Sequence, residues 1–421
     1  MIRQKFANAL LYAAIFLLPW QTRWIYAQLT VGGTPWEYGT LSLYLVEILF
    51  VLVAVLRGRP HLPTALVSLP KFLFFFLGTL AISTSFSVRL PLALGAGLHV
   101  VAALVFLLVL VDERTQMRRV AWAFCAGLIG PSVLGWMQVM SGASPASSVL
   151  GLAEKNAAVA GVSVIETHAG RLLRAYGTFP HPNVFGGYLA VSLVVLGWLG
   201  WTGSRMQRLV AVILATVFST TLVVTFSRSA WLGVMAAMIG LFVWMFQHHV
   251  RATKQLFVLA LIPVFGTLAT CVFFSDALFV RFDTSARLET RSIVEREESL
   301  FTFPSVLRAN PFTGVGPGNY TELLTHLDPG EPGWMYQPVH NVFLLFIAEL
   351  GILGIVGFVR LSKNLFPTIQ ATAKKNPLPF ALAAVLIPPV FFDHYLWSLW
   401  AGLVLGMLCL TLVLKGETTP K

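Results

Sequence analysis

His340 is the residue of this chain best placed to transfer a proton. It lies where a long polar, glycine-punctuated segment that begins at Arg308 gives way to an apolar run. A histidine can accept or donate a proton near neutral pH, although a lone histidine at the mouth of a helix is more often structural. We expect Arg174 and Arg228 to converge on the same face of the protein, which favours an acid–base role for His340.

Arg228 lies at the tip of a tight turn between two apolar runs, in the sequence TFSRSAW. An arginine at the edge of the membrane hydrocarbon is costly unless it reaches water or has a partner. Arg228 is therefore either an interfacial anchor beside Trp231 or a ligand for an anion at the membrane surface. The sequence alone leaves both alternatives open.

Arg174 belongs to a second polar stretch, RLLRAYGTFPHPN, which starts at Arg171 and leads into an apolar run. Its two prolines make the approach to that run rigid, and Asn183 can cap the helix that follows. We predict that His181, between the prolines, is a structural contact rather than a base. Arg174 is expected above the membrane, on the same side as Arg228.

The stretch GVGPGNY is rich in glycine but follows no predicted strand, so it lacks the setting of a nucleotide-binding fingerprint. We predict a turn in which Gly316 lets the backbone approach another segment closely, beside Asn319 and Tyr320. Glu349 lies nine residues after His340, which is about 180° around a helix, so it cannot orient His340 directly. We expect Glu349 to pair within a helix bundle.

No motif for a metal or a cofactor is present. Neither long polar segment contains an Asp-x-Asp pair, and the sequence has no zinc-type spacing, phosphate-binding P-loop or serine-nucleophile elbow. The three cysteines, Cys125, Cys271 and Cys409, lie far apart inside apolar runs and predict neither a disulfide framework nor a metal site. We therefore expect chemistry without a metal ion and without a cofactor.

The polar stretches are set in a very apolar chain. Of its 421 residues, 57% are hydrophobic and 11% are charged, against about 25% charged in a typical soluble domain. The uninterrupted apolar runs have the length of membrane-spanning helices and lack the alternation of a membrane barrel. We predict an all-α, polytopic helix bundle in a lipid bilayer, one integral domain over residues 1–421 with about twelve spans. The expected spans are 6–20, 41–56, 65–83, 93–111, 120–140, 184–201, 209–225, 231–246, 256–274, 341–358, 378–391 and 396–414.

The distribution of basic residues predicts how the chain is threaded. With both termini in the cytoplasm, most lysines and arginines fall in cytoplasmic segments, as the positive-inside rule requires. The first apolar run is then a span rather than a removed signal peptide. The net charge of +11 is explained by this orientation and by an anionic lipid substrate, so we expect no nucleic-acid partner.

Two long segments, 141–183 and 275–340, are then predicted on the outer face. Long outer loops can escape the charge rule; alternatively, arginine is required there because its fork matches phosphate oxygens. Mixed apolar and charged residues in the second segment predict one or two amphipathic helices that break near Pro304. Apart from Lys155, the basic residues of the two segments are all arginine: Arg171, Arg174, Arg281, Arg287, Arg291, Arg296 and Arg308.

Four motifs together resemble the O-antigen ligase/O-antigen polymerase superfamily. They are RAYGTFPHPN, SRSAW, NPFTGVGPGNY and HNVFLLFIAELG, between about residues 171 and 354. Where many members have an aromatic residue in the amphipathic helix before the Asn-Pro motif, this chain has VEREES. The resemblance implies a membrane glycosyltransferase that takes a glycan from undecaprenyl diphosphate at the periplasmic face of the bacterial inner membrane.

The resemblance also implies roles for individual residues. Arg174 and Arg228 would bind the diphosphate of the donor, and His340 would be the essential histidine. Ligase and polymerase members share these motifs, so the acceptor stays open between a lipid A core, a second glycan chain and a protein. The residues expected to support the site are Arg171, His181, Arg291, Gly316, Asn319, Tyr320, Asn341 and Glu349.

Two functions of different classes follow. In a metal-independent, inverting glycosyl transfer, guanidinium groups stabilise the charge on the leaving diphosphate and His340 accepts the proton of the acceptor hydroxyl. A transporter of an anionic lipid or sugar would instead need several ionisable or helix-breaking positions at mid-membrane depth. Only Glu47 and Glu349 are prominent there, while the arginines gather at one surface, so the sequence favours the transferase.

Overall fold

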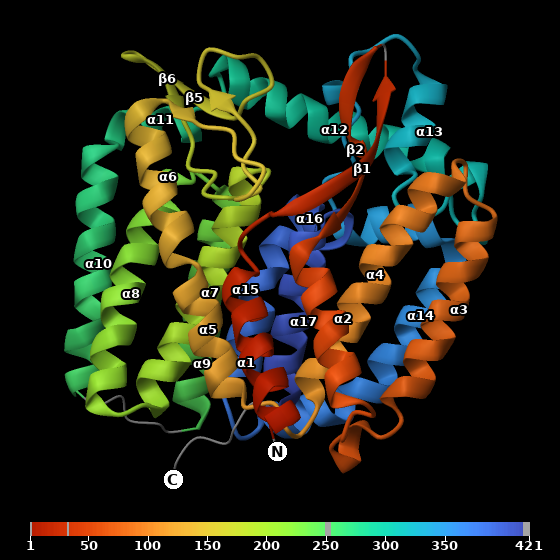
Figure 1. The fold of residues 1–421 in the computed structure, drawn as a ribbon. Helices are drawn as coiled ribbons and strands as arrows, with labels where there is room; N and C mark the ends of the chain where they lie inside the picture. Colours follow the sequence, from red (N-terminus) through yellow and green to blue (C-terminus); the bar gives the residue numbers. More distant parts are fainter. Residues whose placement is uncertain (1, 32, 249–253, 416–421) are drawn as a thin grey trace.

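The computed structural model describes residues 2–31, 33–248 and 254–415, most of which are helical (Figure 1). Two single turns of 3-10 helix occur at Thr64–Leu66 and Gly333–Met335. The helices and strands are α1 (Ile2–Leu17), β1 (Arg23–Val31), β2 (Thr34–Tyr44), α2 (Leu45–Arg57), α3 (Leu69–Ser85), α4 (Leu90–Val111), α5 (Met117–Gly127), α6 (Ile129–Ser141), β3 (Ala143–Ser144), β4 (Lys155–Asn156), β5 (Val164–Thr167), β6 (Gly170–Leu173), α7 (Pro182–Thr202), α8 (Arg205–Val224), α9 (Arg228–Gln247), α10 (Lys254–Phe273), α11 (Ser275–Phe282), α12 (Arg287–Ala309), α13 (Tyr320–Leu327), α14 (Val342–Ala373), α15 (Leu378–Phe392), α16 (Tyr395–Ser398) and α17 (Trp400–Lys415).

Every range predicted to span a membrane contains a helix, but the predicted number of twelve spans is not confirmed. In the described chain, seven helical segments are long and apolar enough to cross a membrane, or eight if the bent pair 261–273 and 275–309 is one span. The apolar helices α15 and α17 are shorter, and α1 and α2 have only 16 and 13 residues. The chain is therefore a mostly helical integral membrane protein.

The prediction of an all-α chain is wrong for the segment after α1, which forms the antiparallel hairpin β1–β2. Its strands are rich in aromatic and β-branched residues, which favour strands. Gly33 has a φ of 77° between the two strands, a conformation that suits glycine. The expected span from residue 41 consequently begins as a strand, and α2 begins only at Leu45. Two shorter hairpins, β3–β4 and β5–β6, follow α6.

The two long polar segments lie at the same end of the bundle, as predicted, together with hairpin β1–β2 (Figure 1). An ion pair between Glu166 of hairpin β5–β6 and Arg287 of α12 (2.5 Å) joins the first segment to the second. Leu288 of α12 packs on the small apolar cluster under the same hairpin. Residues that are far apart in sequence can therefore share one site at this end.

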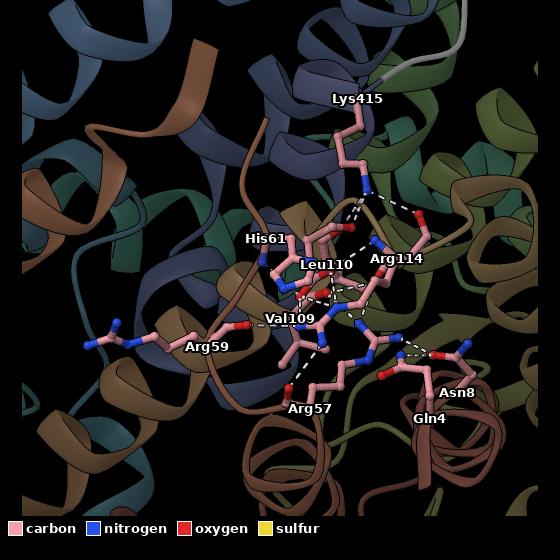
Figure 2. A network of polar contacts seen from close by, with 11 residues as sticks. Gln4, Asn8, Arg57, Arg59, His61, Val109, Leu110, Arg114 and Lys415 are labelled. Carbon is pink, nitrogen blue, oxygen red and sulfur yellow. Dashed lines mark hydrogen bonds and ion pairs between the residues drawn. The ribbon is translucent and has the colours of Figure 1, made fainter. Parts of the chain in front are cut away.

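A buried polar network joins the helices at the other end of the bundle (Figure 2). Arg57 at the end of α2 donates a hydrogen bond to the side chain of Asn8 in α1 (2.6 Å). Lys415 at the end of α17 donates to the main-chain oxygen of Asp112 (2.6 Å), whose carboxylate pairs with Arg114. Cations satisfy the carbonyls that a helix leaves unpaired at its C-terminal end. The first and last helices of the described chain are thus joined at one end through Arg57 and the loop after α4. The assignment of this end to the cytoplasm stays a prediction.

Helices α11, α12 and α13 cover the end of the bundle that carries the long polar segments (Figure 1). The predicted break at Pro304 is wrong, because α12 continues through this residue to Ala309. A proline removes one backbone donor and displaces the carbonyl four residues earlier. Pro304 and Leu300 are both exposed, where water can replace the lost hydrogen bond.

A break inside α14 fixes the helix that follows His340. Gly351 has a φ of 62° and a ψ of −161°, so the backbone groups around it lose their partners within the helix. The glycine-rich loop 310–319 replaces them: Gly316 N donates to Glu349 O (3.0 Å), and Ile352 N donates to Pro311 O (3.0 Å). Backbone groups inside a membrane bundle must be paired internally. The prediction that glycine allows a close backbone approach here is confirmed.

Other predicted supporting residues also lie around this break. The carboxylate of Glu349 accepts a hydrogen bond from Trp397 Nε1 (2.7 Å), so Glu349 pairs within the bundle as expected. Asn319 is fully buried, and its Oδ1 accepts a hydrogen bond from Arg89 N (2.7 Å). Tyr320, also buried, begins α13. These side chains position the start of α14. None of their hydrogen bonds in the described chain involves Arg174 or Arg228.

We predict that Gly314→Ala is much more destabilising than Gly161→Ala. Both glycines have positive φ values, 72° and 82°, so both variants carry a conformational cost of about 1–2 kcal/mol. Only at Gly314 does an added Cβ meet backbone, 2.2 Å from the carbonyl carbon of Glu349, whereas Gly161 is open. Melting temperatures of both variants in the same detergent measure the difference. An equal decrease in melting temperature for both would contradict the close packing of loop 310–319 against the break in α14.

Candidate functional site

The corner between α8 and α9 is the centre of the site. Phe226 in this corner has a φ of 50°, the one positive φ of a non-glycine residue in the described chain, and this left-handed conformation is strained for a residue with a Cβ. Its carbonyl accepts hydrogen bonds from Arg281 Nε (3.0 Å) and Arg174 Nη2 (3.3 Å), while Arg174 Nε donates to Thr225 O (2.8 Å). Two cations thus hold the corner that presents Arg228 at the start of α9.

Arg174 is held almost entirely inside the protein. Its residue is 5% exposed, and burial together with the nearby Arg281 lowers the pKa of Arg174 to about 9, so it is still charged at pH 7. Arg174 Nη2 donates to Asn183 Oδ1 as well (2.7 Å). These hydrogen bonds use Nε and Nη2 of Arg174. Among the described residues no hydrogen bond uses Nη1, so this nitrogen can bind a ligand.

Glu289 of α12 is a buried carboxylate between two arginines. It forms a close pair with Arg281, and both residues are less than a tenth exposed. Its other oxygen lies 3.1 Å from Arg228 Nη2, but that oxygen has no hydrogen bond of acceptable geometry. Arg281 is therefore firmly paired, whereas Arg228, with 24% of its side chain exposed, retains donors that can turn toward a ligand.

Arg296 is a cation without a carboxylate partner in the described part of the chain. Its Nε is buried and has no hydrogen-bond partner. The guanidinium lies close enough to Arg281, Glu289 and Asp393 to interact with their charges. A buried donor without a partner is costly, so Arg296 Nε is a donor that a ligand could use.

His340 lies beside Arg296 and stacks edge-to-face against a second histidine, His394, with 5.2 Å between ring centroids. Burial, and then the positive charge of Arg296, lower the pKa of His340 to about 4, so its ring is neutral at pH 7. Its Nδ1 is buried without a partner. Asn341, the next residue, caps α14 by accepting a hydrogen bond from Leu344 N (3.0 Å).

Asp393 and His394 are site residues that sequence reasoning missed. Asp393 is 4% exposed, and its Oδ2 accepts hydrogen bonds from Asn183 Nδ2 (2.9 Å) and Ser229 Oγ (3.4 Å). Burial raises the pKa of Asp393 to about 6. A signal was present, because this Asp–His pair supplies the only charged or histidine residues between positions 378 and 414.

Two further predicted residues, Arg171 and Arg291, also lie outside this cluster. Arg171 is in hairpin β5–β6, 4.0 Å from Glu166. Arg291 is exposed, pairs with Glu295 (2.7 Å) and lies over the ring of Trp334.

His181 caps α7. The prediction that Asn183 caps this helix is wrong, because the helix begins at Pro182 and Asn183 lies inside its first turn. His181 Nδ1 accepts a hydrogen bond from Asn183 N (3.1 Å). Its other ring nitrogen, Nε2, lies 3.0 Å from Ser163 Oγ. Both ring nitrogens are therefore occupied, which leaves neither for acid–base chemistry.

A cavity of about 370 Å³ lies beneath hairpin β1–β2, and none of Arg174, Arg228, Arg296 and His340 lines it. Two of its lining residues lead to the histidine pair. Ser398 Oγ is 2.7 Å from His394 Nδ1, and the ring of Tyr38 lies edge-on to His394 at 6.0 Å. The arginine cluster therefore lies outside the cavity wall, and His394 and His340 connect the two.

Within the described residues, no group of three or more His, Cys, Asp or Glu side chains is placed to hold a metal ion. The cations that surround the cluster are instead guanidinium groups of the protein.

Residues 213–359 match the family described as O-antigen ligase. The match covers about a third of the chain and supports the O-antigen ligase superfamily. The matched region includes Arg228, Arg281, Glu289, Arg296 and His340, while Arg174 and Asp393 lie outside it. A search of curated proteins finds no match. The match indicates a membrane enzyme of the glycosyltransferase type that acts in polysaccharide biosynthesis, with a glycan donor and an acceptor as substrates.

We predict that Glu289→Gln is strongly destabilising. The change leaves the buried guanidinium of Arg281 without its carboxylate, and breaking a buried ion pair costs about 3–5 kcal/mol. Glu297→Gln, on the exposed side of the same helix, is the matched control and should be nearly neutral. Thermal unfolding in detergent measures both, and a Glu289→Gln protein as stable as the control would contradict the assigned pairing.

Proposed function

We propose that this protein transfers a glycan from undecaprenyl diphosphate to an acceptor hydroxyl at the periplasmic face of the bacterial inner membrane. One observation carries the proposal: in the described residues, four guanidinium groups, of Arg174, Arg228, Arg281 and Arg296, gather around two buried carboxylates, Glu289 and Asp393, beside an uncharged histidine. Glu295, the other carboxylate near Arg296, is half-exposed and pairs with Arg291. The cluster therefore has an excess of two positive charges, which suits an anion such as a diphosphate.

The four arginines divide into two pairs. Arg174 and Arg281 are fixed by the Phe226 carbonyl and act as supports. Arg228 and Arg296 have donors without well-formed bonds and are the groups that bind the diphosphate. A guanidinium fork matches phosphate oxygens and stabilises the negative charge that grows on the leaving diphosphate. Arg296 thereby takes the part in diphosphate binding that the resemblance implied for Arg174.

His340 is proposed as the general base. Its ring is neutral at pH 7, and Nε2 is the nitrogen left accessible, because Nδ1 is buried. The base accepts the proton of the acceptor hydroxyl as that oxygen attacks the anomeric carbon. The bond from that carbon to the diphosphate breaks on the opposite side, its electron pair leaves with the diphosphate, and the configuration inverts. No metal ion is needed, because guanidinium groups carry the charge stabilisation.

The test uses purified protein in nanodiscs with a defined undecaprenyl-diphosphate-linked glycan and candidate lipid, glycan and protein acceptors. The product made distinguishes ligase from polymerase activity. His340→Ala should leave donor binding nearly intact and lower turnover by about 10²–10⁴. Arg228→Lys and Arg296→Lys keep the charge but lose the fork, so donor binding and turnover should both fall.

Arg291→Lys is the control for these substitutions, since Arg291 lies outside the cluster, and it should behave like the wild type. Turnover should also persist in EDTA. A stable His340→Ala protein with a near-normal rate would remove the histidine from the mechanism, and loss of activity in EDTA that magnesium restores would argue against charge stabilisation by arginine alone.

The pH dependence of kcat/KM gives a further prediction. His340 becomes protonated only near pH 4, and burial keeps the pKa values of His181 and His394 well below 6.5. Asp393 has a pKa of about 6 and would add its own titration. In Asp393→Asn protein the acid limb, which reports the free enzyme, is therefore expected near pH 4. A limb near pH 6.5 in this variant would indicate an ordinary histidine and contradict the proposed environment.

A further inference from the structure

We infer that the cavity beneath hairpin β1–β2 binds the sugar units of the acceptor and delivers their hydroxyl to His340. The inference rests on the proposed glycan transfer and adds a location and a chemical class for the second substrate. Three observations support it: the position of the cavity, the chemistry of its lining, and His99, a lining residue whose ring is held by Glu47.

The position of the cavity separates the two substrates. The arginine cluster, which suits a diphosphate, contributes no residue to the cavity wall. The cavity lies next to the histidine pair, because Tyr38 and Ser398 line it and both contact His394. His394 in turn packs against His340. A donor bound at the arginines and an acceptor bound in the cavity would therefore meet at the histidine pair.

The lining combines the two kinds of group that a sugar requires. Side chains of both charge signs, Arg23, Glu37 and Lys155, line the cavity and offer hydrogen bonds to hydroxyl groups. Tyr44 and Trp400 line it too, and their rings stack with 5.9 Å between centroids, which gives the wall an apolar part for the C–H groups of a sugar ring. The cavity also falls within the range of about 300–1,000 Å³ of small-ligand pockets. The mixed lining suits neither a polyprenyl tail nor a second diphosphate.

His99 is a prearranged binding group in this cavity. Its Nδ1 lies 2.6 Å from Glu47 Oε1, and the other oxygen of Glu47 accepts a hydrogen bond from Tyr44 N (2.7 Å). A carboxylate on one ring nitrogen fixes the orientation of the ring. This leaves Nε2 of His99 for a ligand, and we assign it a hydrogen bond to a sugar hydroxyl.

Direct binding tests the inference without need of turnover. Saturation-transfer NMR on the full protein in nanodiscs uses the methyl glycosides of glucose, galactose, mannose, rhamnose and N-acetylglucosamine as probes. At least one should bind saturably. His99→Gln should weaken that binding about three- to tenfold, the effect of one hydrogen bond. Ala153→Trp, which fills an exposed position of the cavity lining, should abolish it, whereas Ala158→Trp, exposed but outside the lining, should not.

The outcomes separate this inference from the proposed function. His340→Ala should keep glycoside binding while it loses transfer, and His99→Gln should raise the acceptor KM with donor affinity unchanged. The assignment is overturned if no glycoside binds, if binding survives both His99→Gln and Ala153→Trp, or if His99→Gln weakens the donor instead. Failure of transfer with every acceptor tested would count against the proposed function. The glycoside-binding measurement would still show whether the cavity binds sugars.

Discussion

Two buried guanidinium groups on one backbone carbonyl are the constraint on which the site depends. Phe226 is held in a left-handed conformation, and its carbonyl accepts hydrogen bonds from Arg174 and Arg281. Removing a guanidinium from water costs several kcal/mol unless hydrogen bonds and an opposite charge compensate. The carbonyls of the corner and the carboxylate of Glu289 supply that compensation for these two arginines. They do not supply it fully for Arg228 and Arg296, and the remaining positive charge is what an anionic substrate can use.

The rest of the fold brings distant segments to this corner. Asn183 at the start of α7 links Arg174 to Asp393, which follows α15. His340 is positioned from the other side, by Asn341 as the cap of α14 and by the loop that pairs with the break at Gly351. Apart from Arg174, which follows strand β6, each of these residues lies at an end of a helix or beside one, where backbone groups lack helical partners and polar side chains are needed. A polar cluster at one end of an apolar bundle follows from that geometry.

The sequence predicted the parts of the site that interrupt an apolar pattern. His340 and Arg228 stand at edges of apolar runs, and the motifs around them resemble the O-antigen ligase superfamily, which the family match supports. Arg281, Glu289 and Arg296 could not be selected among many charged residues of one segment, because burial and pairing decide their roles. Hairpin β1–β2 was missed because its apolar end merges with the next helix. The Asp393–His394 pair was overlooked, although two polar residues in an apolar stretch were a visible signal.

The central claim is that Arg228 and Arg296 bind the diphosphate while Arg174 and Arg281 hold the corner. Its most direct test is a cryo-electron microscopy structure of the protein in nanodiscs with undecaprenyl diphosphate. The account predicts phosphate oxygens within hydrogen-bonding distance of Arg228 and Arg296, with the Arg281–Glu289 pair intact and His340 adjacent. Phosphate bound instead in the cavity at Arg23 and Lys155, with the arginine cluster unoccupied, would contradict it.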